Sequence, residues 1–215
     1  MSRGKKSSEW MRAHVRDPYV RRARDSGYRS RAAFKLIEIL DRDRLLRPGM
    51  TVVDLGAAPG SWSQVAAERV GPSGRVVAVD LTAIEPLGGV VAVQGDFRDP
   101  GVVAALDRSL GGGRCDLVIS DMSPNLSGIA DADQARSLEL CELALGFAQR
   151  ALKQQGSFLV KAFQGAGYPE FLRAMRTAFE TVASRKPGAS RERSSEMYLL
   201  GRRLRTGTRA PGSNG

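Results

Sequence analysis

The stretch TVVDLGAAPGSW, residues 51–62, decides the fold. Its first five residues are mostly apolar or β-branched, which predicts a buried strand that carries one acid, Asp54. A tight turn bounded by Gly56 and Gly60 follows, and residues 61–70 have the composition of a helix. In α/β folds a strand, a glycine turn and a helix bring backbone N–H groups up against a nucleotide-like ligand.

The spacing of this turn differs from that of dinucleotide-binding proteins. Those proteins use G-x-G-x-x-G to approach a pyrophosphate, whereas here only Gly56 and Gly60 are present and Asp54 lies at the strand end. The D-x-G-x-x-P-G form suits a ligand without a pyrophosphate. An ordinary strand–helix turn that binds nothing is the alternative that the motif alone leaves open.

Length and composition indicate one soluble domain. The chain has 215 residues, 42% of them apolar and 26% charged, which suits a single α/β domain. It has no apolar run of membrane-spanning length, and its basic N-terminus lacks the apolar segment of a secretory signal. Two cysteines and one histidine argue against a disulfide framework and a histidine metal site. We expect a cytoplasmic protein with no membrane partner and no metal.

The net charge of +10 is concentrated at the two ends of the chain. Residues 1–35 hold 11 Lys and Arg against 3 Asp and Glu, and residues 185–215 hold 8 against 2. Residues 36–184 hold 14 against 18, so a mildly acidic body lies between two basic ends. This asymmetry favours a polyanionic partner such as RNA, although charge runs also form solvated, solubilising surfaces.

The chain order predicts a Rossmann-like, doubly wound α/β fold with a mostly parallel sheet. We expect a flexible basic arm at 1–16, a single domain at 17–201 and a disordered basic tail at 202–215. Apolar runs predict further strands at 76–80, 90–94, 116–120 and 157–163, with late strands at 181–184 and 196–200. Helical patterns cover 30–42, with Ser30 as N-cap, and 99–110, 132–153 and 169–179.

Three carboxylates follow successive strands and should meet where such sheets bind ligands. Asp80 ends the second predicted strand and is placed to accept hydrogen bonds from ribose hydroxyls. Asp96 follows the third strand, at the adenine end of the same ligand, and Asp121 follows the fourth. Each acid alone could be a helix cap or a turn residue, but three beside a glycine turn favour a binding site.

Lys161 is the unusual residue of the strand SFLVKAF, residues 157–163. Lysine is rarely buried without a partner, and a desolvated lysine can serve as a base. The alternative is an edge-strand lysine that extends to solvent. Glu196 begins the last strand and could face Lys161, so Lys35, Asp121, Lys161 and Glu196 form a tetrad of alternating sign.

Basic residues interleaved with tyrosines precede the glycine turn. This pattern suits phosphate contact and base stacking. The arginines are Arg21, Arg22, Arg24, Arg29 and Arg31, around Tyr19 and Tyr28.

Five motifs in order resemble the FtsJ-type ribose 2′-O-methyltransferases, over about residues 10 to 201. They are YRSRAAFKL at 28–36, DLGAAPGSWSQ at 54–64, QGDFRD at 94–99, SDMSPN at 120–125 and LVKAFQG at 159–165. The family usually has a second glycine after Pro-Gly, where this chain has Ser61. We expect that departure to alter cofactor affinity at most.

The resemblance implies an S-adenosylmethionine-dependent enzyme of the class I methyltransferase fold, monomeric, that methylates a uridine of large-subunit ribosomal RNA in the assembling particle. It implies a catalytic tetrad with Lys161 as proton acceptor. The implied cofactor contacts are Gly60, Trp62, Asp80, Asp96 and Asp121. The expected RNA-binding residues are Arg21, Arg22, Arg29, Arg31 and Lys35.

Two other functions remain open from the sequence. A nicotinamide-dependent oxidoreductase could use the same fold, but the third glycine is missing and the ends are basic. An RNA-binding assembly factor could retain the fold without activity, and the intact tetrad argues against it.

Overall fold

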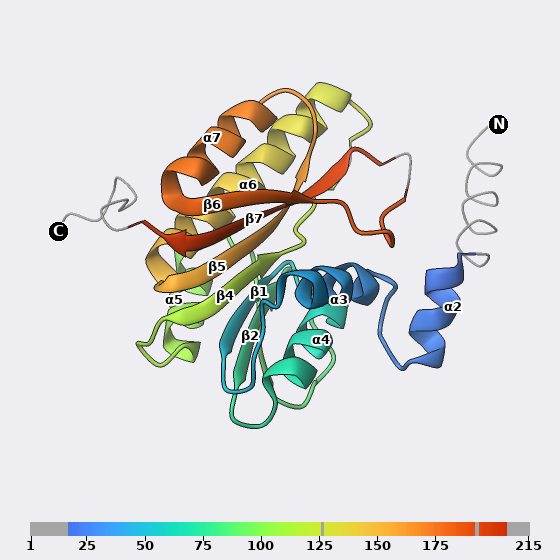
Figure 1. The fold of residues 1–215 in the computed structure, drawn as a ribbon, viewed down its shortest axis with the longest axis vertical. Helices are drawn as coiled ribbons and strands as arrows, with labels where there is room; N and C mark the ends of the chain where they lie inside the picture. The colour runs from blue at the N-terminus through green and yellow to red at the C-terminus, as the bar shows by residue number, and fades with distance from the viewer. Residues whose placement is uncertain (1–16, 126, 192–193, 206–215) are drawn as a thin grey trace.

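The computed structural model describes residues 17–125, 127–191 and 194–205, whose strands form one seven-stranded sheet with helices on both faces (Figure 1). The strands are β1 (Thr51–Leu55), β2 (Arg75–Asp80), β3 (Val90–Gln94), β4 (Cys115–Ser120), β5 (Leu152–Phe163), β6 (Phe179–Arg185) and β7 (Glu196–Leu204). The helices are α2 (Pro18–Asp25), α3 (Ala32–Asp43), α4 (Ser61–Val70), α5 (Pro100–Ser109), α6 (Ala130–Ala151) and α7 (Tyr168–Ala178).

The sheet is doubly wound and mostly parallel, as the sequence predicts. Its strand order is β3-β2-β1-β4-β5-β7-β6. The five strands β3, β2, β1, β4 and β5 are parallel to one another, whereas β7 is antiparallel to both β5 and β6. The order reverses between β1 and β4, and ligands of such folds bind at the carboxyl ends of the strands beside this point.

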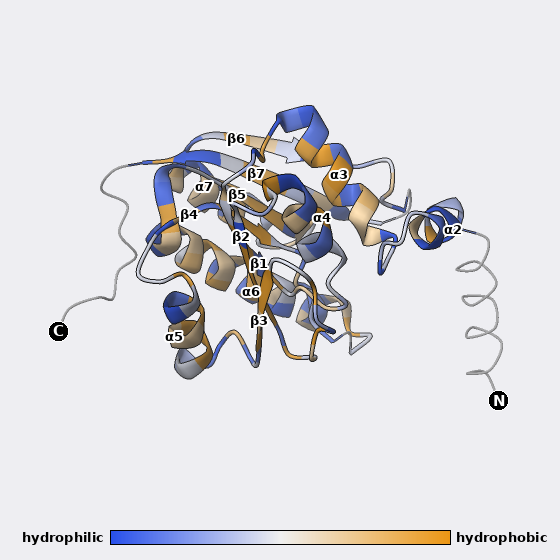
Figure 2. Cartoon of the chain, turned by 90° about the horizontal axis from the view of Figure 1, so that it is seen from below, coloured by the Kyte–Doolittle hydropathy of each residue, from blue (hydrophilic) through white to orange (hydrophobic). Residues whose placement is uncertain are grey.

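Alternation along the strands produces a core on each face of the sheet. Val52, Val76 and Leu117 face helices α3 and α4, and their neighbours Val53, Val77 and Val118 face α5, α6 and α7. Figure 2 shows the central strands largely in orange, whereas β6 and the outer sides of the helices are paler or bluer. Because both faces are covered, the central strands are mostly apolar rather than alternating between apolar and polar residues.

Helix α2 was not predicted. Asp17 caps it by accepting a hydrogen bond from the Tyr19 backbone N–H, and Pro18 occupies its first turn. Its only buried residue is Ala23, which packs against Phe34 and Ala189. The helix is only eight residues long and mostly polar, so it offers too few apolar positions for a search for helical periodicity. The predicted helix at 30–42 is α3, which begins at Ala32, so its N-cap is Arg31 and not Ser30 as predicted. The Ser30 hydroxyl still accepts a hydrogen bond from the Ala32 N–H.

Strand β7 extends past the domain boundary that we expected after residue 201. It runs to Leu204, which is buried, and Arg202 donates hydrogen bonds to Asp43. Strand β5 begins at Leu152 rather than at 157, directly after α6. The expected arm at 1–16 and residues 206–215 of the expected tail lie outside the described residues. Within the described part of the chain, no helix has the length and hydropathy that crossing a membrane requires.

Candidate active site

The glycine turn is packed tightly against the segment that follows β4. Gly56 has a φ of 76°, and a Cβ there would lie 2.6 Å from Cγ and 2.9 Å from Cα of Met122. Gly60 has a φ of 102° and directly precedes α4. Both positions therefore favour glycine because of their backbone angles and because neighbouring atoms leave no room for a Cβ.

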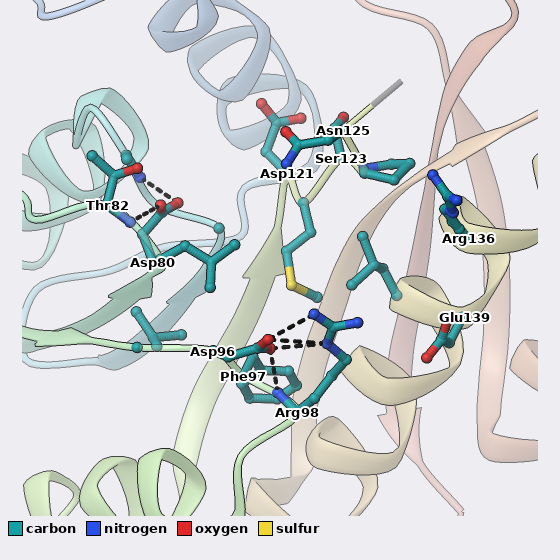
Figure 3. Close-up of a pocket in the computed structure, with 18 residues that line it drawn as sticks. Asp80, Thr82, Asp96, Phe97, Arg98, Asp121, Ser123, Asn125, Arg136 and Glu139 are labelled. Carbon is teal, nitrogen blue, oxygen red and sulfur yellow. Dashed lines mark hydrogen bonds and ion pairs between the residues drawn. The ribbon is translucent and has the colours of Figure 1, made fainter. Parts of the chain in front are cut away.

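A cavity of about 550 Å³ opens beside this turn at the carboxyl ends of the strands. Asp80, Asp96 and Asp121 all line it, as the sequence predicted from their places after β2, β3 and β4 (Figure 3). The side facing α6 is formed by residues 122–125 together with Arg136 and Glu139.

Gly60 and Trp62, the other expected cofactor contacts, do not line this cavity. Trp62 is 2% exposed, and its indole N–H donates to the Ala32 carbonyl oxygen at 2.8 Å. It therefore joins α4 to α3. Ser61 is also directed away from the cavity lining, because its hydroxyl lies 2.8 Å from the Ser30 hydroxyl.

The carboxylates of the cavity are held in fixed orientations. Asp80 accepts hydrogen bonds from the backbone N–H groups of Ala58 at 2.9 Å and Thr82 at 2.8 Å. Asp96 forms an ion pair with Arg98, whose hydrogen bonds lower the pKa of Asp96 to about 2. Both acids therefore present oriented acceptors to a ligand, and Asp96 is ionised at neutral pH.

Asp54 lies directly behind the turn and is fully buried. Its Oδ2 accepts from the Ser63 hydroxyl at 2.6 Å, but Oδ1 has no hydrogen-bond partner among the described residues. Burial, with the nearby charges of Asp121 and Asp80, outweighs the Ser63 hydrogen bond and raises the pKa of Asp54 to about 7. An ionised buried acceptor without a donor is costly, and this cost favours the protonated form of the Asp54 carboxyl.

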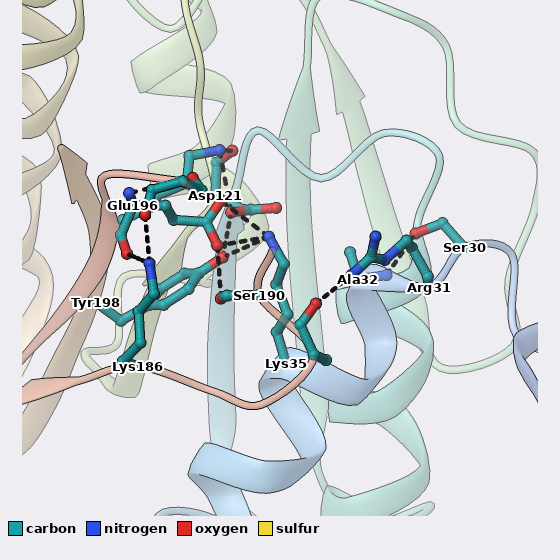
Figure 4. Close-up of polar contacts among 12 residues, drawn as sticks. Ser30, Arg31, Ala32, Lys35, Asp121, Lys186, Ser190, Glu196 and Tyr198 are labelled. Carbon is teal, nitrogen blue, oxygen red and sulfur yellow. Dashed lines mark hydrogen bonds and ion pairs between the residues drawn. The ribbon is translucent and has the colours of Figure 1, made fainter. Parts of the chain in front are cut away.

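The four tetrad residues come together in two ion pairs beside the cavity, and Figure 4 shows Lys35, Asp121 and Glu196 of this group. Lys161 Nζ donates to the Asp121 backbone oxygen at 2.6 Å and lies 3.1 Å from Asp121 Oδ1. Lys35 Nζ lies 2.7 Å and 2.9 Å from the two Glu196 carboxylate oxygens. The side chain of Lys161 is only 7% exposed, so it is not an edge-strand lysine that extends to solvent.

Strand register explains how the tetrad forms, and it reveals a fifth member. Lys161 of β5 is opposite Tyr198 of β7, and Glu196 is two residues away on the same face. The Tyr198 hydroxyl donates to Asp121 Oδ1 at 2.9 Å and accepts from Lys35 Nζ at 3.4 Å. Burial and the charges of Asp121 and Glu196 raise the pKa of Tyr198 well above its usual value, so it stays a neutral donor. The sequence analysis missed Tyr198, although its i+2 spacing from Glu196 was the available signal.

Glu196 is oriented by the loop between β6 and β7. The Ser190 hydroxyl donates to Glu196 Oε1 at 2.8 Å, and Lys186 Nζ donates to the Glu196 backbone oxygen at 2.7 Å. Burial alone would raise the pKa of Glu196, but the Lys35 charge and hydrogen bonds outweigh it, and the pKa is lowered. Glu196 is therefore ionised opposite Lys35. Sequence reasoning missed Ser190 and Lys186 because a loop carries no periodic pattern.

The predicted RNA-binding arginines divide into two groups. Arg21 and Arg22 are exposed on α2, where the Arg22 guanidinium lies 4.4 Å from the centre of the Phe34 ring. Arg31 instead forms an ion pair with Asp17 and donates to the backbone of Ala189. Arg29 donates to backbone oxygens of the protein itself. The sequence treated these four side chains alike because internal contacts do not appear in a charge pattern.

Asp121 belongs both to the lining of the cavity and to the cluster of ion pairs formed by the tetrad. Among the described residues, no group of three or more His, Cys, Asp and Glu side chains is arranged to hold a metal ion. The chemistry that this geometry can perform is the removal of a proton from a hydroxyl placed between the cavity and Lys161.

Comparison with known proteins identifies relatives of the whole chain. The model of the FtsJ-like methyltransferase family matches residues 28–204. The ribosomal RNA large subunit methyltransferase E of Thiobacillus denitrificans is 60% identical over 201 residues, which cover 94% of this chain and 91% of that protein. The protein of the same name from Azoarcus sp. is 59% identical over 205 residues, covering 95% of this chain and 100% of that protein.

A solved structure shares the architecture. The crystal structure of a putative ribosomal RNA methyltransferase from Plasmodium falciparum matches with a TM-score of 0.73 and 27% sequence identity. The match covers 82% of this chain and 98% of that one. The Rossmann-like sheet described above is therefore shared with a protein of that name.

Proposed function

Since the chain belongs to the FtsJ-like methyltransferase family, we propose that it transfers the methyl group of S-adenosylmethionine to the 2′-hydroxyl of a uridine in large-subunit ribosomal RNA. The names of its relatives support ribosomal RNA of the large subunit as the substrate. The basic ends and the exposed arginines of α2 support a polyanionic substrate. The substrate is proposed to be the assembling particle.

The lining of the cavity fits S-adenosylmethionine better than a dinucleotide. Four carboxylates, of Asp80, Asp96, Asp121 and Glu139, outnumber the guanidinium groups of Arg98 and Arg136. This negative lining favours a cationic cofactor and disfavours the pyrophosphate of a nicotinamide dinucleotide.

Each acid has a proposed partner on the cofactor. Asp80 would accept from the ribose hydroxyls, Asp96 from the adenine amino group, and Asp121 would lie at the methionine end. Gly60 and Trp62 are proposed to shape the turn rather than to contact the cofactor, because neither lines the cavity. When bound, the cofactor supplies a methyl group made electrophilic by its sulfonium centre.

The observation that carries the proposal is that Asp121 lines the cavity and also holds Lys161. Once its ammonium has released a proton, the neutral amine of Lys161 would take the proton of the 2′-hydroxyl. The bound cofactor would supply the methyl group and keep the electron pair of the broken carbon–sulfur bond. Lys35 holds the hydroxyl and its neighbouring phosphate. Asp121 and Glu196 orient the two lysines, and this positioning contributes much of the rate.

Methylation of isolated large-subunit particles that lack the modification tests this function. The wild-type protein with methyl-labelled cofactor should label the RNA at a uridine 2′-oxygen, and nuclease-digest mapping would identify that nucleotide. Labelled particles but unlabelled naked RNA would support the particle as substrate. A protein that binds the particles without transferring label would be an assembly factor, and the proposal would fail.

Lys161→Ala tests the proton acceptor. Its turnover should fall roughly a hundred- to ten-thousand-fold, with cofactor affinity close to that of the wild type. Lys153→Ala is the matched control. Lys153 lies on the same strand, β5, but at the end of the strand away from Lys161, where it pairs with Asp116. A wild-type rate in Lys161→Ala would refute the assignment of the base.

A further inference from the structure

Arg29 joins two segments that form the outer part of the cofactor site. Its Nη1 donates to the Pro59 oxygen at 2.9 Å and to the Glu85 oxygen at 2.8 Å, and its Nη2 donates to the Pro86 oxygen at 3.0 Å. We propose that Arg29 is a positioning residue that clamps the glycine turn, residues 56–60, to the loop at 81–89 and thereby sets cofactor affinity. The proposal rests on the proposed function because it takes the cavity to be the cofactor site.

The chain anchors Arg29 from behind. The Arg29 backbone N–H donates to Gln64 Oε1 at 3.3 Å, and Gln64 Nε2 donates to the Gly27 oxygen at 2.9 Å. Next to it, the Ser30 and Ser61 hydroxyls are hydrogen-bonded. The first turns of α4 thus fix the segment that carries Arg29, so the guanidinium projects from a rigid base.

Gly60 makes room for the clamp. A Cβ at Gly60 would lie 2.8 Å from Arg29 Nη1, and 3.0 Å from side-chain carbons of both Ile84 and Leu87. The clamp and the loop therefore close directly over Gly60. This contact explains a glycine at a position that does not line the cavity.

The loop needs such a clamp because it lacks a helix of its own. It connects β2 to β3 without a helix, and its residues Leu81 and Thr82 line the cavity. Leu81 is 61% exposed, so packing contributes little to its position. An untethered loop would have to become ordered when the cofactor binds, and this cost would weaken binding.

The same contacts argue against a phosphate-binding role for Arg29. Three of the five N–H donors of the guanidinium, on Nη1 and Nη2, are bonded to backbone oxygens. The fixed fork geometry of the group sets the direction of these donors. An RNA phosphate could recruit these donors only by releasing the loop. Arg24, which lies five residues earlier and is exposed on α2, provides a matched arginine outside the clamp.

Calorimetric titration of Arg29→Ala, Arg29→Lys and Arg24→Ala with S-adenosylmethionine tests the clamp. Arg29→Ala should raise the dissociation constant about tenfold or more, and Arg29→Lys should recover part of the loss because one ammonium can still reach a carbonyl. Arg24→Ala should bind like the wild type. In turnover, Arg29→Ala should raise the KM for the cofactor while kcat at saturating cofactor stays within a few-fold.

Hydrogen exchange of the cofactor-free variants separates this inference from the proposed function. Backbone amides of residues 82–85 and 87–89 should exchange faster in Arg29→Ala than in Arg24→Ala, whereas those of α7 should not change. Wild-type exchange in this loop and a wild-type cofactor constant, together with weakened RNA binding, would overturn the clamp and return Arg29 to the RNA surface. Failure of the wild-type protein to bind the cofactor would refute the proposed function, while loop exchange would still decide whether the clamp exists.

Discussion

Replacing Asp54 with Asn should change how the stability of the protein depends on pH. Asp54 is fully buried, and its pKa is raised from 3.8 to about 7 in the folded state. The folded state therefore retains a proton that the unfolded state has already released above pH 3.8. The free energy of unfolding should fall as the pH rises from 3.8 to about 7, and this contribution should be constant above pH 7.

The size of this effect follows from the two pKa values. A shift of one unit corresponds to about 1.36 kcal/mol, so three units amount to about 4 kcal/mol above pH 7. Between pH 5 and pH 8 only the last two units are crossed, which corresponds to about 3 kcal/mol. The amide side chain of the Asp54→Asn variant cannot ionise, so this part of the pH dependence should vanish there.

Urea unfolding of both proteins at pH 5, 6, 7 and 8 measures the effect. All other titrating groups are common to the two proteins and cancel in the difference between their unfolding free energies. The amide also introduces an NH2 donor near the Ser63 hydroxyl, but the free energy that this costs is the same at every pH. The difference should move in favour of Asp54→Asn by about 3 kcal/mol from pH 5 to pH 8.

A difference that stays level over this range would refute the reasoning. It would mean that the Asp54 carboxylate is already ionised at pH 5 in the folded protein, with a donor that satisfies Oδ1. The measurement should be repeated at high salt, because a fully buried group is screened much less than surface charges are. A slope that disappeared in salt would point to surface groups instead.

Three further changes test other parts of the site. Asp80→Ala should raise the cofactor dissociation constant by the equivalent of about 1–3 kcal/mol while RNA binding persists; unchanged affinity by calorimetry would leave Asp80 as a turn residue only. Changing Arg21 and Arg22 together to Ala should weaken RNA binding and lower the salt slope by about 0.7–0.9 for each phosphate that is no longer neutralised, whereas Arg176→Ala, on α7 across the sheet, should bind with the wild-type slope. Glu196→Gln should lower the free energy of unfolding at pH 7. The difference from the wild type should shrink as the pH falls below 4.5, because the lowered pKa of Glu196 adds stability only while the carboxylate is ionised. Equal differences from the wild type in urea unfolding at pH 7 and pH 4 would contradict this.

The parts of the site that could be predicted are those that depend on strand order and strand ends. Asp80, Asp96 and Asp121 each follow a strand whose apolar run is visible in the sequence, and parallel strands bring their carboxyl ends together. Lys161 was conspicuous because it interrupts such a run. These signals are local, so the structure confirms where the residues lie, while their roles remain proposals.

The parts that could not be predicted depend on contacts between distant segments. Charge counts cannot distinguish Arg22, which is exposed, from Arg29, which reaches backbone oxygens up to residue 86. Trp62 is next to the glycine turn in sequence, yet its indole is buried beneath α3. A position beside a motif indicates proximity to the site, but only packing decides which way a side chain points.

Sheet topology explains why one residue can serve both halves of the site. β1 and β4 are neighbours although α4, β2, β3 and α5 lie between them in the chain, and the Asp121 N–H donates to the Leu55 oxygen at 3.2 Å. Leu55 is followed directly by the glycine turn, so this bond places Asp121 beside the turn and the cavity. On its other side β4 pairs with β5, which carries Lys161. Any residue at the end of β4 must therefore lie between the cavity and the tetrad, and a carboxylate there can accept from Tyr198 and Lys161 while it lines the cavity.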